Sequence, residues 1–269
     1  MNQILILIYH IGNINSMIIS HKHKYIFIGL PMTGSSAISK ELIELYDGES
    51  IFMKHTNIPY LIKKSNINIK DYYVFGVYRD PIEMAYSQYS KIKVNAKGAF
   101  TNKDLLTKNG GYVTEKKYNF FKKIQSDNYS FLDFIKSKYS FLVYDNPLSI
   151  NYKYLDQIIS FNNLSNEFKE VLTKCNLESK REIPVYNKTI KNEDRPILLP
   201  PKIINKVFSP FLKEYTTHDY RKRDYDISWF SILKYKIAKP LRILYINYRD
   251  SKRDHKFDFY FSKITKNGE

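Results

Sequence analysis

Short apolar segments without polar alternation recur along the chain, and segments with helical spacing follow most of them. Residues 25–28 and 72–78 are unbroken runs rich in aromatic and β-branched side chains, which is typical of parallel strands buried on both faces. Residues 51–53 and 154–161 are weaker strand candidates. From Ser36 onward, apolar residues recur at helical spacing, so a helix follows the first strand.

Further helices are predicted over residues 60–64 and 114–126, over residues 165–172 with Ser165 as the cap, and over residues 202–208 after Pro200 and Pro201. Two helix starts carry clear capping signals. Asp80 precedes Pro81 and Glu83 as an N-cap with a capping-box partner, and this helix is expected to continue to about residue 95. Ser130 caps a helix over residues 130–139, with three apolar side chains expected inward: Phe131, Phe134 and Ile135.

Alternation of strands and helices predicts an α/β fold with a central parallel sheet flanked by helices. Residues 17–20 stand directly before the first strand, and residues 1–16 are interpreted as an N-terminal extension. Residues 97–111 are polar and predict a loop. The α/β domain is expected over residues 17–225 and a basic amphipathic, helical C-terminal tail over 226–269.

Composition narrows the class of protein. With 43% hydrophobic and 16% aromatic residues among 269, the chain is not disordered. Its net charge of +16 and pI near 9.5 favour anionic ligands, but no zinc-finger or RNA-recognition signature points to nucleic acid as a partner. Cys175 is the one cysteine, which excludes an internal disulfide. The apolar run 4–9 is too short for a membrane span.

The segment Gly29-Leu-Pro-Met-Thr-Gly34-Ser-Ser, between the first strand and its helix, has the two glycines of a phosphate-binding loop. Backbone N–H groups at the start of the helix would bind an anion there. A nucleoside-triphosphate loop has Lys after the second Gly, where this chain has Ser35. The loop alone fits a plain strand-to-helix turn equally well.

Two other strand ends decide between these interpretations. Lys54 and His55 follow residues 51–53, and Arg79 follows residues 72–78. Because ligands of open α/β sheets bind at the carboxyl ends of the strands, these side chains are expected near the loop. Arg79 has a plainer alternative, an ion pair with Glu83.

Taken together, these strand ends resemble the sulfotransferase superfamily, particularly bacterial carbohydrate sulfotransferases related to the heparan 2-O-sulfating type. Residues 22–36 are similar to the family's 5′-phosphosulfate loop and residues 75–89 to its 3′-phosphate motif, with Ser eight residues after Arg. Residues 54–56 resemble its Lys-His-Ser/Thr segment. Residues 158–164 and 184–189 match more weakly.

The resemblance implies a P-loop-like three-layer fold that binds 3′-phosphoadenosine 5′-phosphosulfate (PAPS) as donor, without a metal. It implies His55 as the general base and Arg79 with Ser87 as ligands of the 3′-phosphate. The acceptor would be a hydroxyl of a capsular, exopolysaccharide or lipid-linked glycan, and the location cytoplasmic. The 5′-phosphosulfate would lie against the loop residues Pro31, Met32, Thr33, Gly34, Ser35, Ser36 and Ala37.

Met32 departs from the family pattern, which has Lys there to stabilise the leaving phosphate oxygen. Lys54 or Lys22 are the expected substitutes, and otherwise Met32→Lys should raise turnover. Met32 keeps two alternatives open. The first is a catalytically impaired nucleotide- or glycan-binding protein of the same fold, and the second, less favoured, is a nucleotide kinase with an atypical loop.

Residues 221–269 contain 13 Lys and Arg against 6 Asp and Glu. A basic amphipathic helix of this kind binds anionic membranes; the alternative is a helix docked on the catalytic domain. An apolar stripe at approximate helical spacing comprises Trp229, Leu233, Ile237, Leu241, Leu244 and Tyr248.

Overall fold

The computed structural model describes most of the chain between residues 17 and 184 and single positions after it. The described residues are 17–30, 32–52, 56–106, 109, 113–137, 151–184, 203, 229, 230, 233, 236, 237, 240, 241, 244 and 248. The chain divides into two units, residues 1–199 and 200–269. The predictions of an N-terminal extension and of a helix over 202–208 fall almost wholly outside the described residues.

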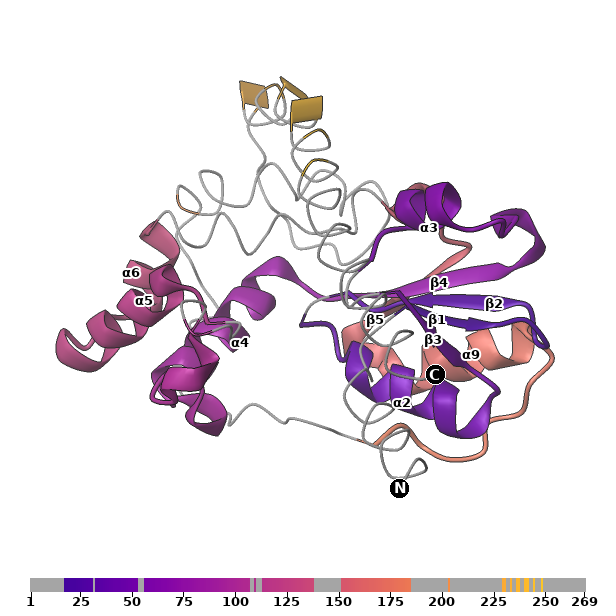
Figure 1. The fold of residues 1–269 in the computed structure, drawn as a ribbon, viewed down its shortest axis with the longest axis horizontal. Helices are drawn as coiled ribbons and strands as arrows, with labels where there is room; N and C mark the ends of the chain where they lie inside the picture. Colours follow the sequence, from indigo (N-terminus) through magenta and orange to yellow (C-terminus); the bar gives the residue numbers. More distant parts are fainter. Residues whose placement is uncertain are drawn as a thin grey trace, which may run out of the picture. The chain divides into compact units, whose positions relative to one another are not determined.

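The first unit is built on a five-stranded mixed sheet, in the order β3-β1-β2-β4-β5, among the described residues. β2, β4 and β5 are parallel neighbours, whereas β1 is antiparallel to both β2 and β3. Figure 1 shows the sheet with helices on both of its sides. The strands are β1 (Met17–Ser20), β2 (Tyr25–Ile28), β3 (Glu49–Ile51), β4 (Tyr73–Tyr78) and β5 (Gln157–Ser160).

The α/β class is confirmed, and the predicted parallel sheet is found in part, because β2, β4 and β5 are parallel whereas the antiparallel β1 makes the sheet mixed. The segment interpreted as preceding the first strand is itself β1, and it turns back through residues 21–24 so that Ile18 pairs with Phe27. Lys24 has φ 52°, a left-handed conformation that permits this tight reversal. Since β3 is antiparallel to β1, it runs in the same direction as β2, and its carboxyl end lies at the edge predicted for the ligand.

Every helix predicted within the first unit is present. The described helices are α2 (Ser35–Leu45), α3 (Ile58–Lys64), α4 (Pro81–Lys93), α5 (Glu115–Ser126), α6 (Phe131–Lys136) and α9 (Leu164–Lys174). Asp80 accepts hydrogen bonds from the backbone N–H groups of Ile82 and Glu83, which confirms it as the N-cap of α4. Ser130 forms the predicted cap of α6 through a capping box with Asp133.

The core lies between the sheet and two helices, α2 and α9, which run along the same side of it in Figure 1, with α3 on the other side. Burial of these large side chains supplies most of the driving force for folding. Cys175, at the end of α9, belongs to this core, and burial raises its pKa to about 11. The cluster comprises Ile18, Tyr25, Phe27, Ile38, Leu42, Tyr46, Phe75, Val77, Ile159, Phe168, Val171, Leu172 and Cys175.

A smaller aromatic cluster joins α4 to α6. Tyr89 of α4 packs against Phe131 and Phe134 of α6, with 5.7 Å between ring centroids in both pairs, and its hydroxyl donates to the carbonyl of Tyr129. Phe131, Phe134 and Ile135 are buried, as predicted. This packing fixes α4, the helix that follows Arg79.

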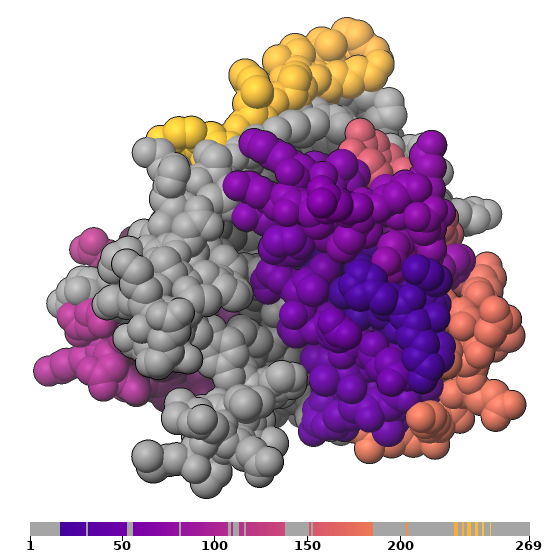
Figure 2. Space-filling model, turned by 45° about the vertical axis from the view of Figure 1, so that its right-hand side comes forward, coloured from indigo at the N-terminus to yellow at the C-terminus, as the bar shows by residue number. Residues whose placement is uncertain are grey.

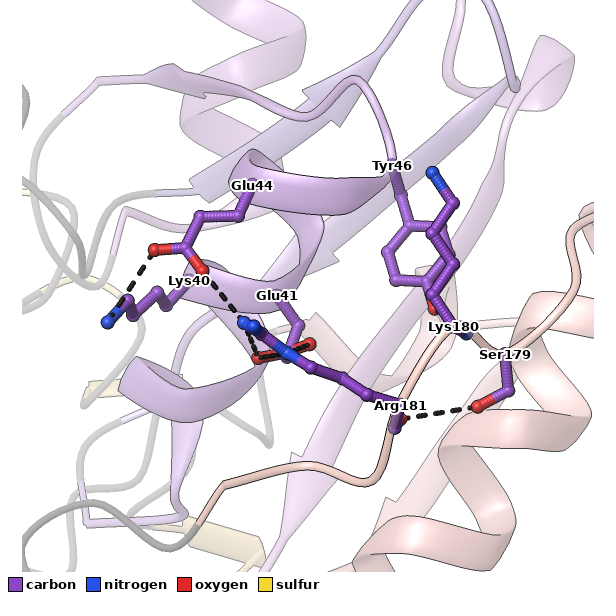
Figure 3. Close-up of polar contacts among 7 residues, drawn as sticks. All are labelled: Lys40, Glu41, Glu44, Tyr46, Ser179, Lys180 and Arg181. Carbon is purple, nitrogen blue, oxygen red and sulfur yellow. Dashed lines mark hydrogen bonds and ion pairs between the residues drawn. The ribbon is translucent and has the colours of Figure 1, made fainter.

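The segment after α9 is attached to α2 by Arg181. Its guanidinium donates to both carboxylate oxygens of Glu41 and to Glu44, at 2.6 to 3.1 Å (Figure 3). Glu41 is only 2% exposed, so its charge depends on this bidentate contact. Lys180 adds a hydrogen bond from its Nζ to the carbonyl of Leu45.

Arg181→Met should therefore lower the midpoint of thermal unfolding by about 5 °C or more, because it leaves the buried Glu41 carboxylate without this partner. Lys169→Met is the matched control, since Lys169 pairs with an exposed Glu182 and should shift the midpoint by no more than about 1 °C. Differential scanning fluorimetry measures both. Equal shifts of the unfolding midpoint in the two variants would show that the ion pair of Arg181 with Glu41 contributes no more than an exposed surface ion pair.

Candidate functional site

The loop between β2 and α2 adopts a conformation that requires glycine at position 34. Gly34 has φ 76°, and a Cβ there would lie 3.1 Å from Cε2 of Phe161. The left-handed conformation and the close approach of the ring both disfavour any side chain. Gly34 is also the N-cap of α2 and provides no side-chain cap.

The hydroxyls of this loop stabilise its shape in the structure. Thr33 Oγ1 and Ser35 Oγ both donate to the carbonyl of Leu30, at 2.9 and 3.0 Å, and both side chains are buried. Ser36 is half-buried, and the backbone N–H of Ala37 donates to the carbonyl of Gly34 at 2.9 Å. The predicted direct role of Ser35 in binding a phosphate would require its hydroxyl to exchange this partner.

The first turn of α2 has the electrostatic character of an anion site. It contains no acidic residue, and neither does that of α3, whereas the first turns of α4, α5, α6 and α9 each contain one. The first N–H groups of an α-helix have no acceptor within the helix, and the helix dipole places partial positive charge there. An anion beside residues 34–36 would therefore be stabilised.

Arg79 brings a guanidinium to this loop from the neighbouring strand. β4 is parallel to β2, with Gly76 opposite Ile28, and it continues through Tyr78 before Arg79. Arg79 Nη1 donates to the backbone carbonyl of Met32 at 3.1 Å. The prediction that Arg79, after β4, lies near the loop after β2 is therefore confirmed.

The plainer alternative for Arg79 is also present. Its Nε lies 3.7 Å from Glu83 Oε2, one turn into α4. A guanidinium carries five N–H donors in a planar fork and can contact several acceptors at once. Arg79 thus links the loop with the start of α4, and the geometry is compatible with either role.

Phe161 is a site residue that the sequence did not identify. Its ring lies 4.2 Å from Arg79 Cζ in a cation–π contact, and it is the group that a Cβ at Gly34 would meet. It stands directly after β5, the next parallel strand beyond β4. The signals in the sequence were its place at the end of the strand predicted over residues 154–161 and the weak family match of residues 158–164.

Ser87 and Lys91 lie one turn apart on α4. Ser87 is 2% exposed and lies about 9 Å along the helix from its start. Lys91 is half-buried, and its Nζ is 3.7 Å from Sδ of Met32. Lys91, like Phe161, was missed, because helical spacing alone does not show which long side chain reaches a distant loop.

Lys22, one of the two cations expected to compensate for Met32, lies elsewhere. It is in the turn between β1 and β2, at the amino end of β2 and so at the opposite end of the strand from the loop. Lys22 Nζ and His23 Nε2 both contact Asp47 Oδ2, at 3.1 and 2.9 Å. These hydrogen bonds, that of His23 first, lower the pKa of Asp47.

Three predicted site residues lie outside the described residues: Pro31, Lys54 and the proposed base, His55. β3 ends at Ile51, shortly before Lys54. Their roles remain predictions from the sequence.

Comparisons with protein-family models, with curated proteins and with solved structures find no match to this chain. None of the helices in the described part of the chain has the length and apolar character needed to cross a membrane. Within the same part, no group of three or more His, Cys, Asp or Glu side chains is arranged to hold a metal ion.

Proposed function

We propose that this protein has a P-loop-like fold and transfers a sulfuryl group from PAPS to a hydroxyl of a glycan. The contact between Arg79 and the carbonyl of Met32 carries the proposal. It joins two features suited to anions, the start of α2 and a guanidinium, at the ends of adjacent parallel strands. A nucleotide with phosphate at both its 5′ and 3′ positions requires two such groups within one site.

In the proposed reaction, the acceptor hydroxyl oxygen attacks the sulfur of the donor. A new oxygen–sulfur bond forms, the bond from sulfur to the bridging phosphate oxygen breaks, and its electron pair remains on 3′-phosphoadenosine 5′-phosphate (PAP). His55 takes the proton of the hydroxyl. The backbone N–H groups at the start of α2 hold the 5′ end, while Arg79 and Ser87 hold the 3′-phosphate.

Release of PAP from PAPS, with and without added glycan fractions, tests this proposal. A transferase releases PAP faster when an acceptor is present. The binding-only alternative, favoured by Met32, predicts that PAP binds but that no fraction stimulates its release. A nucleotide kinase would instead form ADP from ATP. This alternative is disfavoured because Ser35 stands where a nucleoside-triphosphate loop has Lys after its second Gly.

The tail supports a further part of the proposal, contact with an anionic membrane that bears a lipid-linked acceptor. The described apolar residues of the tail, coloured yellow in Figure 2, are helical and 38% to 72% exposed. A basic helix with exposed apolar side chains has the composition of an interfacial helix. The residues are Trp229, Phe230, Leu233, Ile237, Leu241, Leu244 and Tyr248.

Leu241→Ser together with Leu244→Ser should weaken binding to anionic vesicles by about tenfold or more, because two apolar side chains no longer enter the interface. Ile62→Ser is the control, since Ile62 is an exposed apolar residue of α3 in the other unit. Vesicle sedimentation of the full-length variants measures the effect. Equal binding to the vesicles by the wild-type protein, the double variant and Ile62→Ser would contradict a membrane role for the tail.

A further inference from the structure

Two positive charges from the β4–α4 segment contact Met32. The guanidinium of Arg79 binds its backbone carbonyl at 3.1 Å, and Nζ of Lys91 lies 3.7 Å from its sulfur. The loop position that carries no charge in this sequence is therefore in contact with an ammonium group from α4. Both side chains are at least half-buried, so solvent screens their charges less than at an open surface.

The chemistry of Met32 favours an anion in place of its sulfur. A thioether is a weak hydrogen-bond acceptor, so a phosphate oxygen at the same place would be a far stronger partner for an ammonium group. The methionine side chain is unbranched and has three rotatable bonds, so it can move aside when a ligand enters. Its backbone has φ 64°, in the left-handed region.

The spacing on α4 separates the two ends of the ligand. Ser87 and Lys91 are four residues apart, on one face of the helix. Ser87 belongs with Arg79 to the expected 3′-phosphate site, whereas Lys91 reaches the loop that holds the 5′ end. One helix face thus serves both phosphates.

We propose that Lys91 supplies the positive charge that loop position 32 lacks, and that it binds the 5′-phosphate of the donor. This inference rests on the proposed function. As the bond from sulfur to the bridging oxygen breaks, the electron pair stays on the phosphate, and Lys91 donates a hydrogen bond to that oxygen. No further reactant is needed, because the proton of the acceptor passes to His55.

The position of Lys91 beside Met32 changes the effect expected of Met32→Lys. A lysine at position 32 would bring a second ammonium group beside Lys91, and two like charges at this distance oppose each other. The gain in turnover anticipated from the sequence should therefore be small. The same substitution should restore turnover only when Lys91 has been removed.

Calorimetry with two ligands tests the role of Lys91. Lys91→Met should weaken binding of PAP by about tenfold to a hundredfold and leave binding of adenosine 3′-monophosphate, which lacks the 5′-phosphate, unchanged. Lys91→Arg should keep most of the affinity for PAP. Lys93→Met is the matched control, since Lys93 is an exposed basic residue of the same helix; thermal unfolding of each variant reports on folding.

The double variant Met32→Lys, Lys91→Met moves the charge from the helix to the loop, and it should recover affinity for PAP and release of PAP from PAPS. Affinity for PAP that is equal in Lys91→Met and Lys93→Met would overturn the inference and leave the proposed function standing. Failure of the wild-type protein to bind PAP would remove the proposed function, and the inference with it. Equal losses for both ligands would assign Lys91 a structural role and also overturn the inference.

Discussion

His55→Ala is expected to lower the rate of sulfuryl transfer by about 100- to 10,000-fold, because the acceptor hydroxyl loses its general base. The affinity for PAP should change by less than about twofold, since in the proposed reaction His55 acts on the acceptor and not on the nucleotide. Release of PAP in the presence of an acceptor glycan measures the rate, and calorimetry measures the affinity.

His23→Ala is the matched control for this variant. His23 lies at the amino end of β2, where it contacts Asp47, and its removal should leave transfer unchanged. A His55→Ala variant that transfers at the wild-type rate would exclude His55 as the base, whereas equal losses in both variants would indicate a general loss of folding.

Arg79→Ala is expected to weaken binding of PAP by about a hundredfold and to leave binding of AMP nearly unchanged, because the lost charge-assisted hydrogen bonds act on the 3′-phosphate. Arg79→Lys should have an intermediate effect, because lysine keeps the charge but not the bidentate geometry. Competition between the two nucleotides gives the ratio of affinities directly.

Glu83→Gln distinguishes binding of the 3′-phosphate by Arg79 from its ion pair with Glu83. It removes the ion pair that Arg79 forms with α4 but retains the guanidinium. If Arg79 serves only to pair with Glu83, both variants will lower the unfolding midpoint equally and neither will change the ratio of affinities. A ratio that falls in Arg79→Ala alone supports the 3′-phosphate site.

Local patterns in the sequence predicted most elements of the first unit. Periodicity found the helices, and the capping signals of Asp80 and Ser130 gave the starts of α4 and α6. β1 was missed because its three apolar residues and Ser20 form too short a run to predict a separate strand that pairs with β2. The chain reversal between β1 and β2 depends on the left-handed backbone conformation of Lys24. Lysine rarely adopts this conformation, so the residue type does not predict it.

The candidate site was predictable only where residues stand directly at strand ends. Arg79 and the loop follow neighbouring strands, and parallel pairing alone brings them together. Lys91 reaches the loop because aromatic packing fixes α4. Phe161 also stands at a strand end, but its side chain type gave no reason to expect it beside Gly34 and Arg79. Such contacts depend on tertiary packing, which spacing along one element does not encode.

The most direct test of the central claim is the affinity of the wild-type protein for three nucleotides: PAP, AMP and ADP. A site with one group for the 5′-phosphate and another for the 3′-phosphate should bind PAP about tenfold or more tightly than either of the others, because only PAP engages both Arg79 and the start of α2. Isothermal titration calorimetry gives the three dissociation constants under identical conditions. A clear preference for PAP is the predicted result, and equal affinities for the three nucleotides would contradict the account.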